Sequence, residues 1–409
     1  MKIKMGFGSI PPSVWAVYAI QMVFAAASNV IGTILPNLVD GFNLTLSQVG
    51  VISAVQSLTG PPIIFLAGFM SDHLGPVRVL LIGLILLIAC PLFMAAASSY
   101  ILLVVSIAVL GIAFGFIDPM TNAVLVEGGG REKGKYLSLL HAAYGLGAAI
   151  FPVLIAFALA KGMSWRFSLL ALASLVFGVT VVFFRCRVQE KPGQGIGGAA
   201  QGNSLSSHSD HPTTWTFDLL IPTIAMFFYS GVYRNLAVWM VMYFKDILGA
   251  TQVIGSLALF TLFGAIVIGR LISAKMSDSK DNLLLLTVYM TGAAAALTPI
   301  AWIRSQFMGF IAIAGFGLAS AGIFPVITSY ATGLFPARSG MVTGFIYGSA
   351  SAGAVALPWL MGIVADNFGL RSGMLMNAIS MAIAGFLLVV AFSRRMVRQR
   401  RPKSVSIRF

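Results

Sequence analysis

The chain has 409 residues, of which 58% are hydrophobic and only 9% are charged, and its mean hydropathy is +0.93. A soluble domain carries about 25% charged residues, so this composition excludes a soluble globular protein and indicates one that lies in a membrane. The formal net charge of +14 would suggest a nucleic-acid partner in a soluble protein. In a membrane protein such a charge reflects topology, and no nucleic acid is expected.

A hydrocarbon core about 30 Å thick requires roughly 20 apolar residues per helix. By this rule the sequence predicts an all-α membrane protein with twelve transmembrane helices. The first six lie near residues 13–38, 47–69, 77–97, 100–125, 135–160 and 166–185. The second six lie near residues 217–244, 252–274, 283–303, 307–333, 340–364 and 370–392.

The second half of the chain repeats motifs of the first at a constant offset. Gly111–Pro119 recurs as Gly317–Pro325, and Pro152 recurs as Pro358. The repeat predicts two six-helix bundles joined by a Gly- and Ser-rich segment that behaves as a flexible linker. We expect an N-terminal bundle at residues 1–188, a cytoplasmic linker at 189–214, a C-terminal bundle at 215–393 and a basic cytoplasmic tail at 394–409.

Most of the 26 lysine and arginine residues lie on the side of the predicted bundle that also holds the two termini. The opposite side has only Lys161, Arg166, Lys245, Arg304 and Arg371, whereas Arg234 lies within the seventh span. Cytoplasmic loops of membrane proteins carry an excess of basic residues. The sequence therefore predicts a multi-pass protein of the cell (inner) membrane with both termini in the cytoplasm.

A glycine-rich motif follows the second span, Gly68-Phe-Met-Ser-Asp72-His-Leu-Gly75-Pro-Val-Arg78. It resembles the signature of the major facilitator superfamily between helices 2 and 3, and two six-helix halves in pseudo-two-fold repeat are the fold of that superfamily. The resemblance implies transport by alternating access, in which one half rocks against the other around a site near the bilayer midplane. It also implies that Gly68, Asp72 and Gly75 belong to a latch, with Arg78 or Arg131 as the cationic partner of the aspartate.

Several of the predicted spans carry further motifs of polar and glycine residues. They are Asp118–Asn122, Leu140–Gly147, Tyr229–Asn235, Gly317–Pro325 and Ser349–Gly353. In order and spacing these motifs resemble those of the fucose–galactose–glucose:proton symporters, especially the bacterial glucose/mannose type. The resemblance implies proton-coupled symport of a monosaccharide or a similar small polar solute, with Asp118 and Asn122 central to proton coupling.

Asp118 is an acid within a predicted membrane helix, which makes it a functional-site hypothesis because burying a carboxylate in hydrocarbon is costly. An acid in a low dielectric readily takes up a proton, and Asn122 shares its helix face and can bond a sugar hydroxyl. We expect His141 to meet Asp118, since such a pair would relay protons. Two alternatives stay open: Asp118 pairs with a structural polar neighbour, or His141 bonds only to the backbone.

The chain departs from the symporter pattern at two positions. Many symporters carry an acid in helix 7, where this chain has Tyr233 and Arg234, and the fucose type carries one in helix 1 at the position of Gly32. These departures raise the expectation of an anionic or more apolar solute. Three roles for Arg234 stay open: it pairs with Asp118, binds a substrate carboxylate, or extends towards the outer interface. The remaining substrate-binding candidates are Asn29, Gln56, Tyr144 and Asn235.

The leading prediction is a proton-coupled symporter, and the alternatives are proton-driven efflux of drugs or amphipathic compounds and transport of an organic anion. An enzyme is not expected, because the sequence shows no Ser/His/Asp set, no phosphate-binding loop and no cluster with metal-ligand spacing. The expected partners are a small-molecule substrate, protons and the lipid bilayer, with no metal or cofactor, and a monomer is expected. Sodium coupling is not indicated, because the sequence predicts neither an acid-rich cavity nor a broken helix.

Overall fold

The computed structural model describes residues 11–128, 133–186, 217–277, 281–335 and 338–400. The first half consists of α1 (Pro12–Phe42), α2 (Leu46–Leu74), α3 (Pro76–Ala96), α4 (Tyr100–Gly128), α5 (Lys133–Ala160) and α6 (Trp165–Cys186). The second half consists of α7 (Phe217–Asp246), α8 (Gln252–Ser277), α9 (Asn282–Leu297), the 3-10 turn η4 (Thr298–Ala301), α10 (Gln306–Ser320), α11 (Ile323–Leu334), α12 (Ser339–Phe368) and α13 (Leu370–Arg400). These ranges contain no strand.

The helices account for twelve membrane spans. Eleven are long and apolar enough to cross a membrane, with α10 and α11 counted together as the span Gln306–Leu334. The remaining helix, α7, is 30 residues long but carries Arg234 and Lys245 among its apolar residues. Its residues 235–243 are all buried in the bundle. The predicted all-α fold with twelve transmembrane helices is therefore confirmed.

The tenth span is interrupted near its middle. The span predicted near residues 307–333 is present as Gln306–Leu334, and within it a two-residue turn separates α10, which ends at Ser320, from α11, which begins at Ile323. The break matters for the site, because Phe324 in the first turn of α11 reaches the central cavity.

Two residues account for the break. Pro325 has no N–H to donate to the carbonyl of Ala321, and Gly322 has the low helix propensity of glycine. The internal repeat does not predict this break. Pro119 corresponds to Pro325, yet the helix that contains it, α4, is continuous. The residue that corresponds there to Gly322 is Phe116, so only the second half combines the proline with a glycine one turn earlier.

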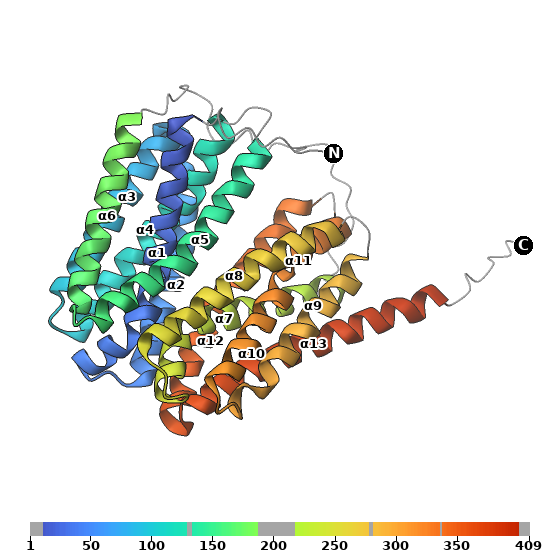
Figure 1. Cartoon of the computed structure of the whole chain (residues 1–409). Helices are drawn as coiled ribbons and strands as arrows, with labels where there is room; N and C mark the ends of the chain where they lie inside the picture. The colour runs from blue at the N-terminus through green and yellow to red at the C-terminus, as the bar shows by residue number, and fades with distance from the viewer. Residues whose placement is uncertain (1–10, 129–132, 187–216, 278–280, 336–337, 401–409) are drawn as a thin grey trace, which may run out of the picture.

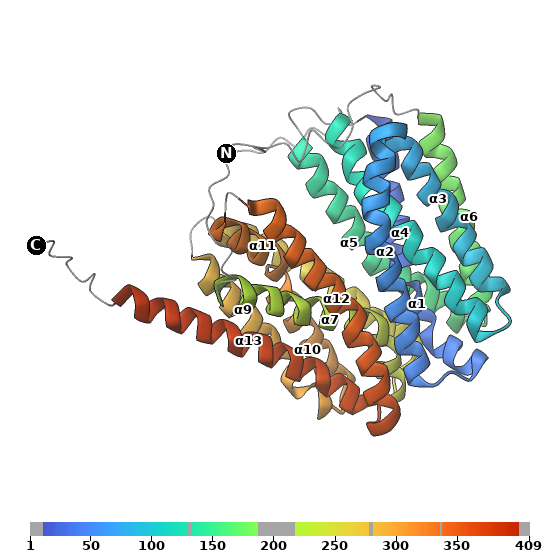
Figure 2. The ribbon, with the colours of Figure 1, turned by 180° about the vertical axis from the view of Figure 1, so that it is seen from behind.

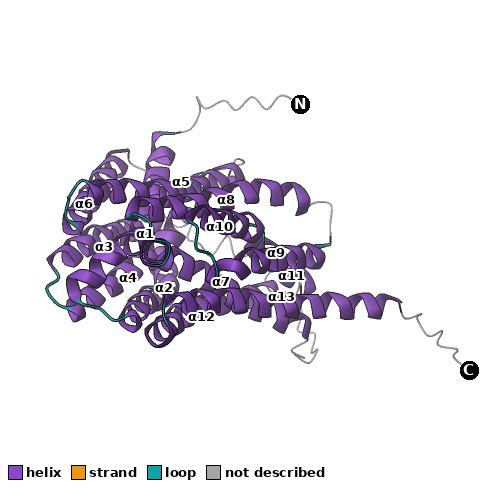
Figure 3. Ribbon diagram, turned by 60° about the horizontal axis from the view of Figure 1, so that its bottom comes forward, coloured by secondary structure: helices purple, strands orange, loops and turns teal. Residues whose placement is uncertain are grey.

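Helices α1–α6 form one bundle and α7–α13 form the other, and the two bundles lean against each other (Figure 1 and Figure 2). Three pairs of helices join them: α2 with α12, α5 with α8, and α1 with α7. In Figure 3, with the bottom turned forward, α1 and α7 lie near the centre of the molecule and α2 and α12 lie side by side. Any site between the halves is thus bounded by helices from both.

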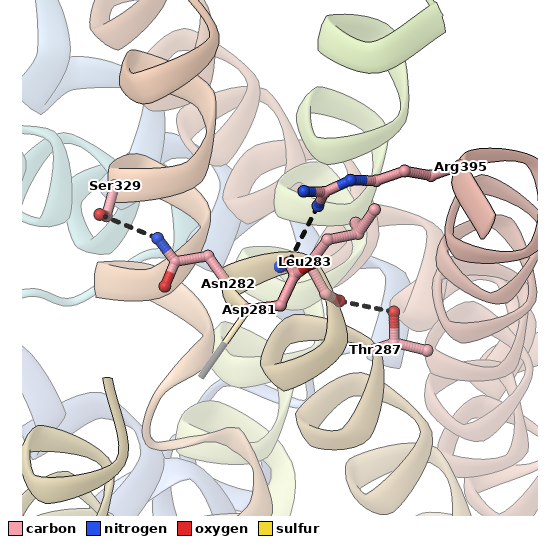
Figure 4. Close-up of polar contacts among 6 residues, drawn as sticks. All are labelled: Asp281, Asn282, Leu283, Thr287, Ser329 and Arg395. Carbon is pink, nitrogen blue, oxygen red and sulfur yellow. Dashed lines mark hydrogen bonds and ion pairs between the residues drawn. The ribbon is translucent and has the colours of Figure 1, made fainter. Parts of the chain in front are cut away.

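We call the side on which α1 begins and α13 ends the terminal side, and the opposite one the distal side. On the terminal side Arg395 of α13 pairs with Asp281 at the start of α9, with 2.9 Å between Nη1 and Oδ1 (Figure 4). The same carboxylate caps α9 by accepting from the backbone N–H of Leu283 at 2.8 Å. Asn282 donates to the hydroxyl of Ser329 in α11 at 3.4 Å. These contacts hold the terminal-side ends of α9, α11 and α13 together within the second half.

The helix α13 continues past the predicted end of the last span to Arg400. Residues 394–400 of the predicted tail are therefore helical. The predicted linker at 189–214 and residues 401–409 lie outside the described residues.

Candidate functional site

A cavity of about 500 Å³ lies between the two halves. Its polar wall consists of Gln21, Ser28, Gln56, Ser57, Asp118, His141 and Tyr144 from the first half, and of Tyr233, Arg234, Arg270 and Ser351 from the second. Phe24, Phe114 and Phe324 add aromatic surface. Binding pockets for small molecules have volumes of about 300–1,000 Å³ and combine apolar walls with a few polar groups, so the size and lining suit a small solute.

Polar contacts between the halves close the distal side of the molecule. The side chain of Gln252 in α8 donates to the carbonyl of Thr33 at 2.7 Å and to the side chain of Asn37 at 2.8 Å, both in α1. Lys245 near the end of α7 lies 3.6 Å from the carboxylate of Asp40 near the end of α1. The central cavity therefore has its closed end on the distal side.

Asp118 on α4 and His141 on α5 both expose their side chains to the cavity. They lie close enough to interact through charge. The side chain of Gln21 lies within hydrogen-bonding reach of the Asp118 carboxyl, and its Oε1 accepts from the hydroxyl of Thr121 at 3.1 Å. The structure thus brings Asp118 and His141 together, while their role in proton coupling stays a prediction.

Arg234 extends from α7 across the cavity wall to the first half. Its Nη2 donates to Oε1 of Gln56, and its Nη1 donates to the carbonyl of Ser28 at 3.5 Å. Its Nε is buried and has no hydrogen-bond partner. The guanidinium therefore lies at the cavity and does not extend to the outer interface, and among the described residues it makes no ion pair with Asp118.

Arg270 is a cavity residue that the sequence did not reveal. It lies near the end of α8, where a basic residue is expected from the excess of positive charge on the cytoplasmic side. In the structure its side chain lines the cavity and interacts through charge with His141 and Tyr233. The packing of α8 accounts for this position. The neighbouring Gly269 packs so tightly that an added Cβ would lie 2.7 Å from the carbonyl of Leu318, which places this part of α8 inside the bundle.

Two tyrosines complete the wall. The hydroxyl of Tyr144 lies within hydrogen-bonding reach of Ser28 and Asn29. The ring of Tyr233 packs 6.2 Å from the ring of Tyr229 and 6.2 Å from that of Phe263, measured between centroids. Both residues line the cavity, as do Gln56 and Arg234, so four of the predicted substrate-binding residues lie at its wall.

Three predicted substrate-binding residues do not line the cavity. Asn122 donates to the carbonyl of Asp118 at 2.7 Å, and Asn29 donates to the carbonyl of Ala25 at 2.9 Å, so each bonds to its own helix. Asn235 donates to Oδ1 of Asn377 in α13 at 2.7 Å. In this conformation Asn29 supports Tyr144, whereas Asn122 and Asn235 do not line the cavity.

The position of Gly32 explains one departure from the symporter pattern. A Cβ at this residue would collide with the backbone carbonyl of Ala237 in α7 and lie 3.2 Å from the Cα of Val238. The helices α1 and α7 therefore touch through their backbones here. An acidic side chain at position 32 has no room in this packing.

The described residues of the predicted latch lie at the exposed end of α2 and around the turn that follows it. Gly68 has open space where a side chain would be, and Asp72 and Arg78 are both exposed. Within the described part of the chain neither of these charged residues makes an ion pair. Arg131 lies outside the described residues, and Gly75 ends α2 with a φ of 81°.

Three relatives are similar to this chain along most of its length. It is 24% identical over 408 residues to the probable 4-methylmuconolactone transporter of Cupriavidus pinatubonensis, covering 94% of this chain and 92% of the relative. It is 24% identical over 338 residues to the fosmidomycin resistance protein of Escherichia coli, covering 82% and 81%. It is 23% identical over 347 residues to the cyanate transport protein of Escherichia coli, covering 83% and 86%.

Solved structures support the fold and the family model identifies the superfamily. A bacterial homologue of the human lysosomal transporter Spinster, in an inward-facing and occupied conformation, superposes with a TM-score of 0.76 at 14% identity, over 96% of this chain and 98% of that one. The relatives named above do not support the narrower resemblance to fucose–galactose–glucose symporters. The family model described as Major Facilitator Superfamily matches residues 17–318 and 284–407, and the chain therefore belongs to this superfamily of membrane transporters.

Proposed function

We propose that the protein is a proton-coupled transporter of a small organic anion, which works by alternating access in the cell (inner) membrane with both termini in the cytoplasm. The observation that carries the proposal is the guanidinium of Arg234, whose Nε is buried at the cavity without a partner. A buried charged donor without a partner is costly, and a carboxylate or phosphonate oxygen would satisfy it. Arg270 supplies a second cation in the same cavity.

Asp118 gives the proposed site a means of coupling anion to proton. When it is ionised, its negative charge repels a bound anion, and this repulsion is strong where the dielectric is low. When it takes up a proton, the repulsion is removed and the two arginines dominate the cavity. Proton binding and anion binding therefore favour each other, and by linkage the effect is reciprocal. Such positive coupling is what a symporter requires.

The relatives favour the same class of solute. Two are named for 4-methylmuconolactone and cyanate, and the third for resistance to fosmidomycin. The first of these compounds carries a carboxylate, cyanate is itself an anion, and fosmidomycin is a phosphonate. The two cavity arginines also disfavour efflux of cationic drugs, because the positive charges would repel each other.

Symport of a monosaccharide is the second candidate. It is supported by the motifs of the fourth, fifth, tenth and eleventh spans and by the polar side chains of Gln56, Tyr144 and Tyr233 in the cavity wall. It is weakened by Asn122, whose amide bonds to its own helix and is turned away from the cavity. The two candidates assign Arg234 different roles. An anionic solute neutralises its charge, whereas a neutral sugar does not.

A binding screen separates the candidates. The purified protein is heated with small carboxylates, phosphonates, monosaccharides and cationic drugs, and a ligand at 100 times its Kd should stabilise the fold by about 2.7 kcal/mol. We expect the anions to raise the Tm of the wild type but not that of Arg234→Gln. Arg185→Gln, an exposed arginine at the end of α6, is the matched control and should keep the response. Stabilisation by monosaccharides and by no anion would reject the anion proposal.

A further inference from the structure

Asp366, at the distal end of α12, makes two hydrogen bonds to the first half. Its Oδ1 accepts from the backbone N–H of Leu46 and its Oδ2 accepts from that of Ser47, both at 2.7 Å. Leu46 and Ser47 form the first turn of α2, so a carboxylate of the second half caps a helix of the first. The partial positive charge at a helix N-terminus adds to these charge-assisted hydrogen bonds.

The start of α2 is fully capped only because of this contact. The first four N–H groups of a helix have no partner within it. Thr45 and Gln48 satisfy two N–H groups through a capping box, with bonds of 2.9 Å and 3.2 Å. The intervening groups, on Leu46 and Ser47, depend on Asp366. Opening the distal side would remove the partner of both.

A glycine one turn before the aspartate permits the approach. A Cβ at Gly362 would lie 2.5 Å from the carbonyl of Leu46 and 3.0 Å from the Cα of Gly50. A Cβ at Gly50 would in turn lie 2.9 Å from the carbonyl oxygen of Pro358 and 3.0 Å from that of Trp359. The helices α2 and α12 therefore meet backbone to backbone beside the Asp366 cap.

This distal turn repeats the motif of the predicted latch. Gly362-Ile-Val-Ala-Asp366-Asn-Phe-Gly369 has the spacing of Gly68-Phe-Met-Ser-Asp72-His-Leu-Gly75. The last glycines have φ and ψ of 83° and 159° in one turn and 81° and 153° in the other. Each donates its N–H four residues back at 2.9 Å. The two turns are thus alike in sequence and backbone but lie on opposite sides of the membrane.

Among the described residues the close backbone approach seen at the distal turn has no counterpart at the turn of Asp72. At the terminal side a Cβ added at Gly68 would meet nothing within 4 Å, and the same holds at Gly340, Gly344 and Gly348 along the first turns of α12.

We infer that Asp366 is a gating residue of this transporter, which holds the distal side closed and must release α2 before that side can open. Gly362, Asp366 and Gly369 form a turn on the distal side that corresponds to the turn of Gly68, Asp72 and Gly75 on the terminal side. Because the two turns lie on opposite sides, engagement of one accompanies release of the other. The balance between them then sets the fraction of molecules open to each side, whatever the solute.

Spin-label distances across the distal side test this inference. Labels are placed at Lys161→Cys and Arg304→Cys, exposed positions in the first and second halves, in a background without Cys90 and Cys186. We expect Asp366→Asn to shift the distance distribution of the purified protein towards longer values. The side-chain oxygen of asparagine can accept only one of the two bonds well, and it carries no charge.

Asp281→Asn is the matched control, because Asp281 also caps a helix but its partners lie within one half. It should leave the distance distribution unchanged. Gly362→Ala should shift it like Asp366→Asn, since the methyl group displaces α2; this second variant carries the test if the first does not fold. An unchanged distribution in the folded Asp366 or Gly362 variants, or an equal shift in Asp281→Asn, would overturn the inference.

Discussion

Arg234 of α7 donates a hydrogen bond to the side chain of Gln56 in α2, so a cation of the second half is held by the first half at the wall of the cavity. The contact crosses the interface about which the halves must rock. A bound anion that takes over part of the guanidinium would compete with Gln56 and so affect how the halves are joined. The solute and the conformational change are thereby connected through one side chain.

Arg234→Gln should weaken binding of an anionic solute by about tenfold to a hundredfold. A hydrogen bond to a charged group contributes about 1.5–3 kcal/mol, and each 1.4 kcal/mol is a factor of ten in affinity. The measurement is the Kd of the anion found in the binding screen, by calorimetry on purified protein. Arg185→Gln should retain the wild-type Kd. Equal affinities in all three proteins would remove Arg234 from the site.

Asp118→Asn should abolish uphill uptake while exchange of labelled for unlabelled solute continues. The amide keeps the size of the side chain but cannot carry a proton between the two sides. Uptake against a gradient and exchange are measured in the same proteoliposomes. If the variant still accumulates solute, the proton is coupled through another group.

The affinity for the anion should rise as pH falls. Protonation of Asp118 removes a negative charge from the cavity, so the protonated form binds the anion more tightly. In Asp118→Asn the affinity should stay near the low-pH value of the wild type between about pH 6 and pH 8.5, where a carboxylate ligand remains ionised. The Kd is measured over this range in both proteins. A wild-type Kd that does not change with pH would contradict the linkage.

Asp72→Asn should act in the opposite direction to Asp366→Asn. Loss of the terminal-side aspartate should enlarge the population open on that side and slow turnover, because the state with the terminal side closed loses its cap. A cysteine at the cavity residue Ser351 reports this through its rate of reaction with a membrane-impermeant thiol reagent added from either side. An unchanged ratio of rates would make Asp72 a turn residue only.

The fold and part of the site follow directly from the sequence. The span count follows from the length of apolar helix that a bilayer requires, and that constraint leaves few alternatives. Asp118, His141 and Arg234 stand out because ionisable side chains inside a membrane helix face the interior of the bundle or a water-filled cavity. The structure places all three at the cavity.

The rest depends on contacts that spacing does not determine. An amide four residues after Asp118 can face a solute or bond back to its own helix, and Asn122 does the latter. Arg270 lies close enough to the end of its span to be taken for a topology signal. The turn at Asp366 was not predicted, because the superfamily signature lies between helices 2 and 3 on the terminal side. Its partner, the start of α2, is 320 residues away in sequence.

The most direct test of the account is proton movement driven by a solute in proteoliposomes that contain a pH-sensitive dye. Addition of a small carboxylate such as a muconolactone should acidify the lumen of wild-type vesicles, and this signal should be lost in Asp118→Asn and strongly reduced in Arg234→Gln. Arg185→Gln should give the wild-type signal. Acidification driven by neutral monosaccharides, with none from any anion, would contradict the account.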